Sequence, residues 1–256
     1  GAAGLPWRTW FADAQVLLTR SEPTAQVPFG AAIKGGHNAE HHNHNDVGSD
    51  TIVLDGVEML GDPGGEIYTR RTFSRERYVS KVLNSYGHPV PVVAGKLQPT
   101  GRQAAAKVLD VAFSPERDRL ELDLRAAYPV QELATLMRSY VHDRPSRVIE
   151  VVDAVRFTSP QTFSVPLVTY REVYRRDDQT VFLYDTQRCV EVRVTIEGGP
   201  WRLEEELIEN PGRPSPKRLA FTFLEPVEQA RVGFRITPCD IRSEERRVGK
   251  ECRSRW

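Results

Sequence analysis

Hydrophobic and polar residues alternate with a period of two along much of this chain. Leu120, Leu122 and Leu124, for example, are separated by charged residues. Because successive side chains of a strand point to opposite faces, such a stretch predicts a strand with one buried and one solvated face. Strands with this or a more continuous apolar pattern are expected at residues 14–19, 51–54, 120–124, 148–157, 163–170, 180–184, 190–196, 219–223 and 232–236.

Glycine and proline lie between these stretches, most visibly in the Asp-Pro-Gly-Gly sequence at residues 62–65. Such clusters mark turns. Many strands joined by turns, each buried on one face, predict stacked antiparallel sheets. We therefore expect an all-β fold, a large antiparallel β-sandwich with at most one or two short helices. The best candidate helix is residues 129–140, where Leu133, Leu136 and Met137 follow helical spacing.

The length of 256 residues is enough to bury a core without disulfide support. We expect residues 1–241 to form one sandwich domain. Residues 242–256 are mostly charged, and we expect a disordered tail that resembles translated vector sequence more than a native terminus. The first ten residues hold no leader segment, so we expect either that a signal peptide was removed or that the chain is a fragment.

Charge and cysteine content exclude several classes of protein. The 35 acidic and 35 basic residues balance, which argues against binding of nucleic acid by bulk electrostatics. No apolar run approaches the roughly 20 residues of a membrane span. Cys189, Cys239 and Cys252 lack the paired spacing of a cysteine zinc site. Cys189 and Cys239 either form a disulfide or remain two free buried thiols.

Histidine is concentrated in one short segment, because four of the six histidines lie between His37 and His44. An H-x-H-x-D pattern runs from His42 to Asp46. In an extended strand His42, His44 and Asp46 would share a face, where they could bind a metal ion or transfer protons. The alternative is that these histidines only cap turns. A cupin-type metal site is disfavoured, because no glutamate follows at the spacing that such a site requires.

Three stretches, the first of which contains these histidines, extend this observation. They are GGHNAEHHNHNDVGSDTIVLDG at residues 35–56, MLGDPGGEIYTRRTF at residues 59–73 and NSYGHPVPVVAGKLQ at residues 84–98. Their order and spacing together resemble the β-sandwich portion of heparinase II/III-type polysaccharide lyases. Residues 10–21 resemble the strand that opens this domain. The resemblance covers about the first 100 residues well and the remainder only as architecture.

The resemblance implies a zinc site beside a substrate cleft. It assigns His44, Asp62 and His88 as zinc ligands, with water in the fourth position, and favours a structural over a catalytic role for the metal. The first histidine of the H-x-H pattern lies at the cleft in this family, so His42 is expected to be catalytic. Asp46 is then a candidate for orienting an imidazole through its other ring nitrogen.

Residues near these blocks are candidates for contact with an acidic sugar. They are Glu40, His41, Tyr68 and Arg71, since an arginine can form paired hydrogen bonds with a carboxylate. The alternative is that they form an ordinary solvated surface. His142 lies far from these blocks in the sequence, and we expect it on the surface.

The activity that the resemblance implies is β-elimination at a uronic acid of an acidic polysaccharide. The family's other catalytic groups belong to an N-terminal α/α-toroid domain, which this sequence lacks. We therefore expect the chain to need that domain as a partner and to be inactive alone. The resemblance also implies a periplasmic or extracellular location. Two alternatives are a non-catalytic carbohydrate-binding or structural β-sandwich with a structural zinc, and an unrelated metal-dependent oxygenase.

Overall fold

The computed structural model describes residues 6–22 and 24–239. Within these residues the chain forms nineteen strands, four short 3-10 helices and no α-helix, which confirms the predicted all-β fold. No helix in this part of the chain is long and apolar enough to cross a membrane. The predicted tail at residues 242–256 lies outside the described residues, and the domain boundary at residue 241 stays a prediction.

The strands form four antiparallel sheets. The largest contains, in spatial order, β14 (Glu172–Asp177), β15 (Thr180–Tyr184), β16 (Cys189–Glu197), β19 (Val227–Cys239), β12 (Val148–Gln161), β11 (Leu133–Asp143), β10 (Arg117–Asp123) and β9 (Lys107–Phe113). A five-stranded sheet contains β1 (Arg8–Phe11), β2 (Val16–Arg20), β3 (Phe29–Lys34), β5 (Asp50–Leu54) and β6 (Val57–Leu60). A four-stranded sheet contains β17 (Trp201–Leu207), β18 (Lys217–Phe223), β13 (Phe163–Thr169) and β7 (Val92–Val93).

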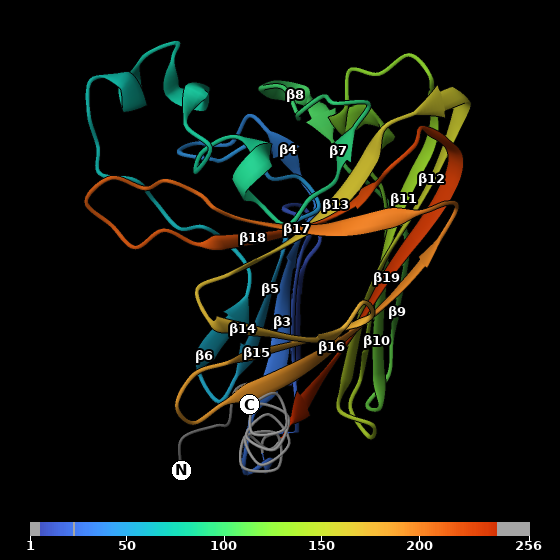
Figure 1. Ribbon diagram of the computed structural model, residues 1–256. Coiled ribbons are helices and arrows are strands. Elements are labelled where there is room, and N and C mark those ends of the chain that lie inside the picture. The colour runs from blue at the N-terminus through green and yellow to red at the C-terminus, as the bar shows by residue number, and fades with distance from the viewer. Residues whose placement is uncertain (1–5, 23, 240–256) are drawn as a thin grey trace, which may run out of the picture.

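The smaller elements lie mostly between these sheets. β4 (His37–Asn38) pairs with β8 (Gly101–Ala105). The 3-10 helices are η1 (Arg71–Phe73), η2 (Arg77–Val79), η3 (Ser85–Gly87) and η4 (Arg125–Ala127). The first three belong to one long excursion between β6 and β7, at the same end of the molecule as β4 and β8 (Figure 1).

Aliphatic and aromatic side chains fill the space between the sheets. Phe221 of β18 meets Phe234 of β19 with ring centroids 5.3 Å apart, and Phe29 of β3 lies 5.9 Å from the ring of His142 of β11. The four-stranded sheet therefore packs on the eight-stranded sheet at β19, and the five-stranded sheet packs on it at β11 (Figure 1). The predicted alternation holds in β10, where Leu120 is fully buried. Burial of one such side chain contributes about 1.5–3 kcal/mol.

The helix expected at residues 129–140 is absent, because most of this segment belongs to β11. The pairing of β11 with β12 shifts register between Leu133 and Thr135. Such a bulge adds one residue, so Leu133 and Leu136 both face the core although they are three positions apart. A bulged strand therefore reproduced the spacing of a helix.

The expectation that His142 lies on the surface is also wrong. His142 is 2% exposed, and its Nδ1 lies 2.9 Å from the hydroxyl of Thr19. It occupies an inward position of β11, two residues after the buried Tyr140. Burial and the charge of Arg144 lower the pKa of His142 to about 4. The side chain is therefore a neutral part of the core near pH 7.

A disulfide joins the two strands at one end of the pairing between β16 and β19. Cys189 and Cys239 lie directly opposite each other in the register, and their Cα atoms are 5.2 Å apart. Of the two sequence alternatives, the structure shows the bridge. It links strands in the middle of the largest sheet.

A buried charge cluster lies between β11, β12 and β5. Arg138 and Asp153 are register partners, and the guanidinium donates hydrogen bonds of 2.8 and 2.7 Å to the two carboxylate oxygens. Asp50 of β5 lies 3.8 Å from the same guanidinium. Burial raises the pKa of Asp50 to about 7, Arg138 opposes this rise and Asp153 adds to it.

The raised pKa of Asp50 predicts a pH-dependent stability. The unfolded chain loses this proton near pH 4, whereas the folded chain holds it to about pH 7. The resulting stabilisation is fully present below about pH 4 and is lost as the pH rises to about 7. Between pH 4 and pH 8, Asp50→Asn, neutral at every pH, should differ from the parent by losing about 2–4 kcal/mol less stability to urea. Other groups that titrate in this range, such as His142, are the same in both proteins. Asp13→Asn, an exposed control, should keep the parental slope, and a slope equal to that of the parent in Asp50→Asn would refute the assignment.

Candidate metal centre

The histidine-rich segment between β4 and β5 is a series of turns. Residues 39–49 contain no strand, and His42 has a left-handed backbone with φ of 58°. His42 is exposed and His44 is half-buried, whereas Asp46 is buried and paired with Lys34 at 2.6 Å. The expectation that these three side chains share a strand face is wrong, because the chain turns at His42. The role of Asp46 in orienting an imidazole stays a prediction.

Asp62 lies in the turn that follows β6. Its Oδ1 accepts a hydrogen bond of 2.6 Å from the backbone N–H of Gly64, which has φ of 67°. Aspartate and glycine favour this kind of turn, because the carboxylate can bond the backbone two residues on. The hydroxyl of Tyr170 donates to the carbonyl of Pro63 at 2.5 Å. The turn is thereby held against the chain directly after β13.

His88 follows η3 and has no solvent exposure. Its Nε2 lies 3.1 Å from the carbonyl of Val82, to which it can only donate. A neutral ring then carries its lone pair on Nδ1. That atom is buried without a hydrogen-bond partner, and it lies 3.2 Å from Oδ2 of Asp62. A lone pair that faces a carboxylate across this distance suits a proton or a metal cation between them.

His44 completes the group. One donor atom from each of His44, Asp62 and His88 lies within 4.8 Å of the others. The two imidazole rings meet edge to face, with centroids 5.1 Å apart. Two imidazole nitrogens and one carboxylate oxygen are a donor set that Zn²⁺ accepts in a tetrahedral site with one open position. The residues therefore fit the metal that the sequence resemblance implies.

The electrostatics of the three side chains are coupled. Burial and His88 lower the pKa of His44, although Asp62 opposes this. Burial alone would raise the pKa of Asp62, but its contact with His88 and the charges of both imidazoles lower it to about 2. Burial alone would lower the pKa of His88, but Asp62 raises it. Near neutral pH the group thus offers an ionised carboxylate and a neutral His44.

The sheets that carry this group have a known arrangement. No family model and no curated protein matches the chain. Among solved structures, a heparinase III matches with a TM-score of 0.76 at 14% identity. The heparan sulfate lyase HepC from Pedobacter heparinus matches with a TM-score of 0.74 at 16% identity. This chain has the fold of the matched part of heparinase III.

The resemblance to heparinases is thereby confirmed at the level of the fold. Each of the two matches covers 94% of this chain and 37% of the other chain. The chain therefore spans little more than a third of the length of the heparinase III and HepC structures.

The residues expected to contact a sugar are spread over two segments of this heparinase-like fold. Glu40 and His41 are exposed on the turn before His42. Tyr68 is 65% exposed, and its ring meets that of Phe73 at 5.4 Å. Arg71 is held by the buried carboxylate of Glu66 at 2.5 Å. Arg71 therefore stabilises its own segment, and its contact with a sugar stays a prediction.

Sequence reasoning missed two residues beside the group. The guanidinium of Arg77 donates to the carbonyl of Asn43 at 3.2 Å, and its charge adds to the effects that lower the pKa of His44. Arg77 thereby connects the η2 segment to the histidine turn. Glu58 of β6 is the other, because burial, with Asp62 adding, raises its pKa to about 7. The one signal in the sequence that could have indicated Glu58 is its position four residues before Asp62.

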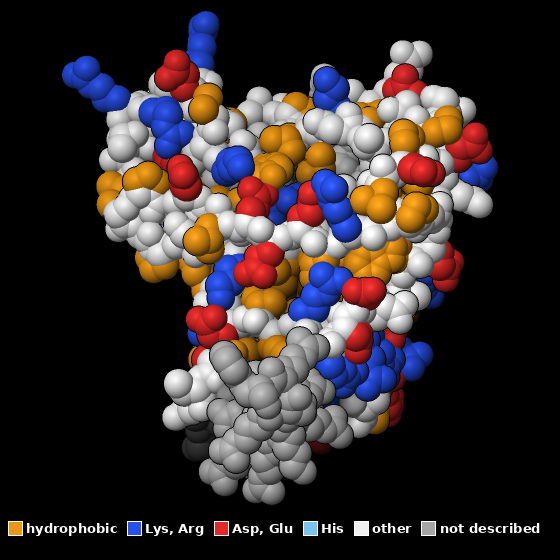
Figure 2. Space-filling model, viewed as in Figure 1, with side chains coloured by type: hydrophobic (Ala, Val, Ile, Leu, Met, Phe, Trp, Pro, Cys, Tyr) orange, Lys and Arg blue, Asp and Glu red, His pale blue; other side chains and the backbone are white. Residues whose placement is uncertain are grey.

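Charge is mixed over the face of the molecule that Figure 2 shows. Figure 2 shows Lys and Arg side chains interspersed with Asp and Glu, and basic side chains that project at the end carrying η1 and η2. Arg70 and Arg75, on either side of η1, are exposed. Positive charge and the exposed ring of Tyr68 are thus found together in the segment that follows the Asp62 turn.

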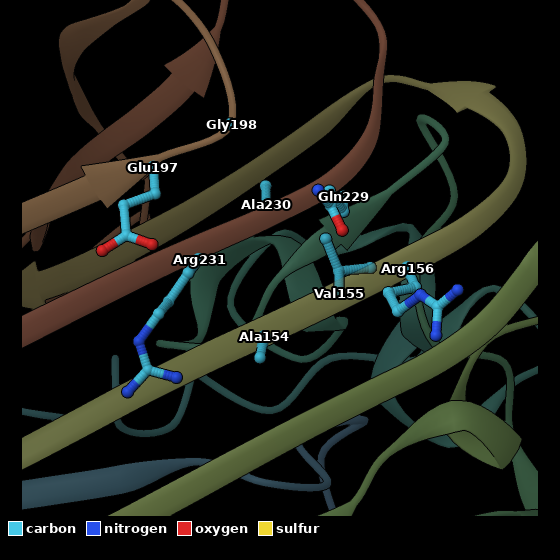
Figure 3. Close-up of a pocket in the computed structure, with 8 residues that line it drawn as sticks. All are labelled: Ala154, Val155, Arg156, Glu197, Gly198, Gln229, Ala230 and Arg231. Carbon is cyan, nitrogen blue, oxygen red and sulfur yellow. The ribbon is translucent and has the colours of Figure 1, made fainter.

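A separate hollow of about 300 Å³ lies on the largest sheet, where the register of β12 against β19 shifts between Arg156 and Gln161. Figure 3 shows Glu197 and Arg231 on one side of it and Arg156 on the other. It shares no residue with the histidine group. The hollow therefore reflects irregular strand pairing in the heparinase-like sheet and is distinct from the metal-binding candidates.

Proposed function

We propose that this chain is the β-sandwich part of a polysaccharide lyase that cleaves a uronic-acid-containing polysaccharide by β-elimination. In this proposal His44, Asp62 and His88 hold a zinc ion, and His42 acts on the substrate. The observation that carries the proposal is the convergence of these three ligands within 4.8 Å on a heparinase III fold.

The zinc has a structural role in this proposal. Its three ligands come from three separate turns, after β4, after β6 and after η3. When bound, the ion supplies positive charge and a link between these turns. The unpartnered Nδ1 of the buried His88 supports this role, because that atom gains a bond that the protein alone does not give it.

In this proposal His42 takes part in chemistry rather than in metal binding. It is exposed and lies two residues before His44, on a turn that the metal ligand would fix. In β-elimination a base removes the proton from C5 of the uronate, its electrons form the C4–C5 double bond, and the C4–O bond breaks as its oxygen takes a proton. We propose that His42 neutralises the substrate carboxylate or transfers one of these protons.

An acidic polysaccharide and a helical partner domain complete the proposal. Exposed Tyr68, Arg70 and Arg75 offer an aromatic face and positive charge to such a substrate. The chain spans 37% of the HepC structure, and we propose that an α/α-toroid domain supplies the other side of the cleft. The disulfide between Cys189 and Cys239 supports export to the periplasm or beyond, since disulfides persist in oxidising compartments.

Zinc titration of the metal-free chain tests the ligands. We expect one Zn²⁺ per chain, measured by competition with a chromophoric chelator. Asp62→Asn and His44→Ala should each weaken binding by more than the ~10–100-fold typical of residues that only support a ligand. His41→Ala, an exposed change in the same segment, should bind zinc as the parent does. Parental zinc affinity in Asp62→Asn would refute the ligand assignment.

Ultraviolet absorbance of the unsaturated uronate product tests the activity. We expect no turnover of heparan sulfate or alginate by this chain alone. A chimaera in which the chain replaces the matching part of HepC should release product from a uronate polymer. In that chimaera His42→Ala should lower kcat by about 10²–10⁴-fold, the usual contribution of a proton-transferring side chain.

The control for this assay is Arg193→Ala, an exposed change on β16, which should leave turnover unchanged. Rapid turnover by the chain alone would contradict the need for a partner domain. A folded, zinc-binding chimaera that releases no unsaturated product from any uronate polymer would contradict the lyase proposal and favour a carbohydrate-binding or structural module.

A further inference from the structure

We infer that Arg138 is a positioning residue that sets the geometry of the metal centre. It does so by holding together the two histidine-bearing segments, the one that carries His44 and the one that carries His88. The inference rests on the proposed zinc site. Arg138 bonds to backbone carbonyls near the ligands and not to the ligand side chains themselves. The inference follows from the groups that accept hydrogen bonds from the guanidinium.

One nitrogen of Arg138 contacts both segments. Its Nη1 donates to the carbonyl of Gly48 at 2.8 Å and to the carbonyl of Pro89 at 2.6 Å. Gly48 lies four residues after His44, and Pro89 is the residue directly after His88. A displacement of either carbonyl would therefore be passed to a ligand through a very short piece of chain.

The other side of the guanidinium is fixed to the largest sheet. Nε and Nη2 donate to the two carboxylate oxygens of Asp153, and both side chains are buried. Paired hydrogen bonds of this kind fix the plane of the guanidinium as well as its position. Tyr140, two residues along β11, donates from its hydroxyl to the same Gly48 carbonyl. The sheet thus presents rigid donors to the two segments.

The two segments are also joined directly to each other. The backbone N–H of Asn45 donates to the carbonyl of Leu83 at 3.0 Å. The side chain of Gln98 accepts from the N–H of Val47 at 2.9 Å and donates to its carbonyl at 2.8 Å. The amide of Asn45 therefore reports whether the His44 segment stays seated against the His88 segment.

Lysine cannot replace Arg138 in this position. The lysine ammonium carries all its donors on one nitrogen. The site, in contrast, needs two hydrogen bonds to Asp153 and two more to carbonyls on the opposite side. Arg138→Lys keeps the positive charge beside Asp153, but the three donors of one ammonium cannot make all four of these hydrogen bonds. We therefore expect loosened ligand segments with the charge preserved.

Arg144→Lys is the matched control. Arg144 is also buried, pairs with the buried Asp118 and donates to backbone carbonyls, among them that of Arg20 at 2.7 Å. Arg144 directly follows β11, and its contacts lie on segments that carry no metal ligand. Both substitutions therefore disturb a buried arginine–aspartate pair, and only one of them disturbs the histidine-bearing segments.

Two measurements on the full chain test the inference. In zinc titrations Arg138→Lys should bind at least about tenfold more weakly than the parent, whereas Arg144→Lys should stay within about twofold. In the metal-free protein, Arg138→Lys should accelerate hydrogen exchange at the Asn45 amide about tenfold or more, and Arg144→Lys should not. Equal zinc affinity in parent and Arg138→Lys, or equal losses in both variants, would overturn the inference.

The exchange measurement separates this inference from the proposed function. If the parent binds no zinc, the metal proposal fails, and exchange at Asn45 still decides whether Arg138 holds the segments. If Arg138→Lys does not fold, Tyr140→Phe takes its place, because it removes only the hydroxyl that donates to Gly48. Tyr140→Phe should bind zinc about threefold more weakly and exchange faster at Asn45. Parental values for both would refute the inference that hydrogen bonds at the Gly48 carbonyl position the His44 segment.

Discussion

The buried pair of Arg138 and Asp153 constrains the part of the molecule where chemistry is proposed. A guanidinium in the core is tolerated only when its N–H groups are bonded. Asp153 accepts two of these bonds from a neighbouring strand, and the carbonyls of Gly48 and Pro89 accept others. Irregular segments on either side of β5 and β6 must therefore approach the largest sheet at this point. The position of the candidate metal centre follows from the requirements of one charged side chain.

The fold was largely predictable because strands with one buried face leave a regular trace in the sequence. The trace failed where the backbone departs from that regularity. The bulge at the start of β11 placed Leu133 and Leu136 on the same face and gave a false helical signal. His142 was misplaced because a lone histidine carries no sign of burial, although its inward register on β11 decides the matter.

The candidate site was predictable only in part. Periodicity suggested a strand for His42 to Asp46, and the structure shows turns instead. Asp62 and His88 became candidates through the resemblance alone, because nothing in their spacing connects them to His44. The role of Arg77 could not be predicted for a different reason. It acts on a backbone carbonyl, which every residue possesses, so its partner leaves no distinctive residue type in the sequence.

The three candidate ligands differ in how far they are covered by protein. His88 has no exposed surface, whereas the side chain of Asp62 is 37% exposed. An ion held between them would exchange with solvent from the carboxylate side. A chelator approaching from water would therefore reach Asp62 and the half-buried His44 before the imidazole of His88. The rate of metal loss would then be governed by the mobility of the Asp-Pro-Gly turn rather than by opening of the core.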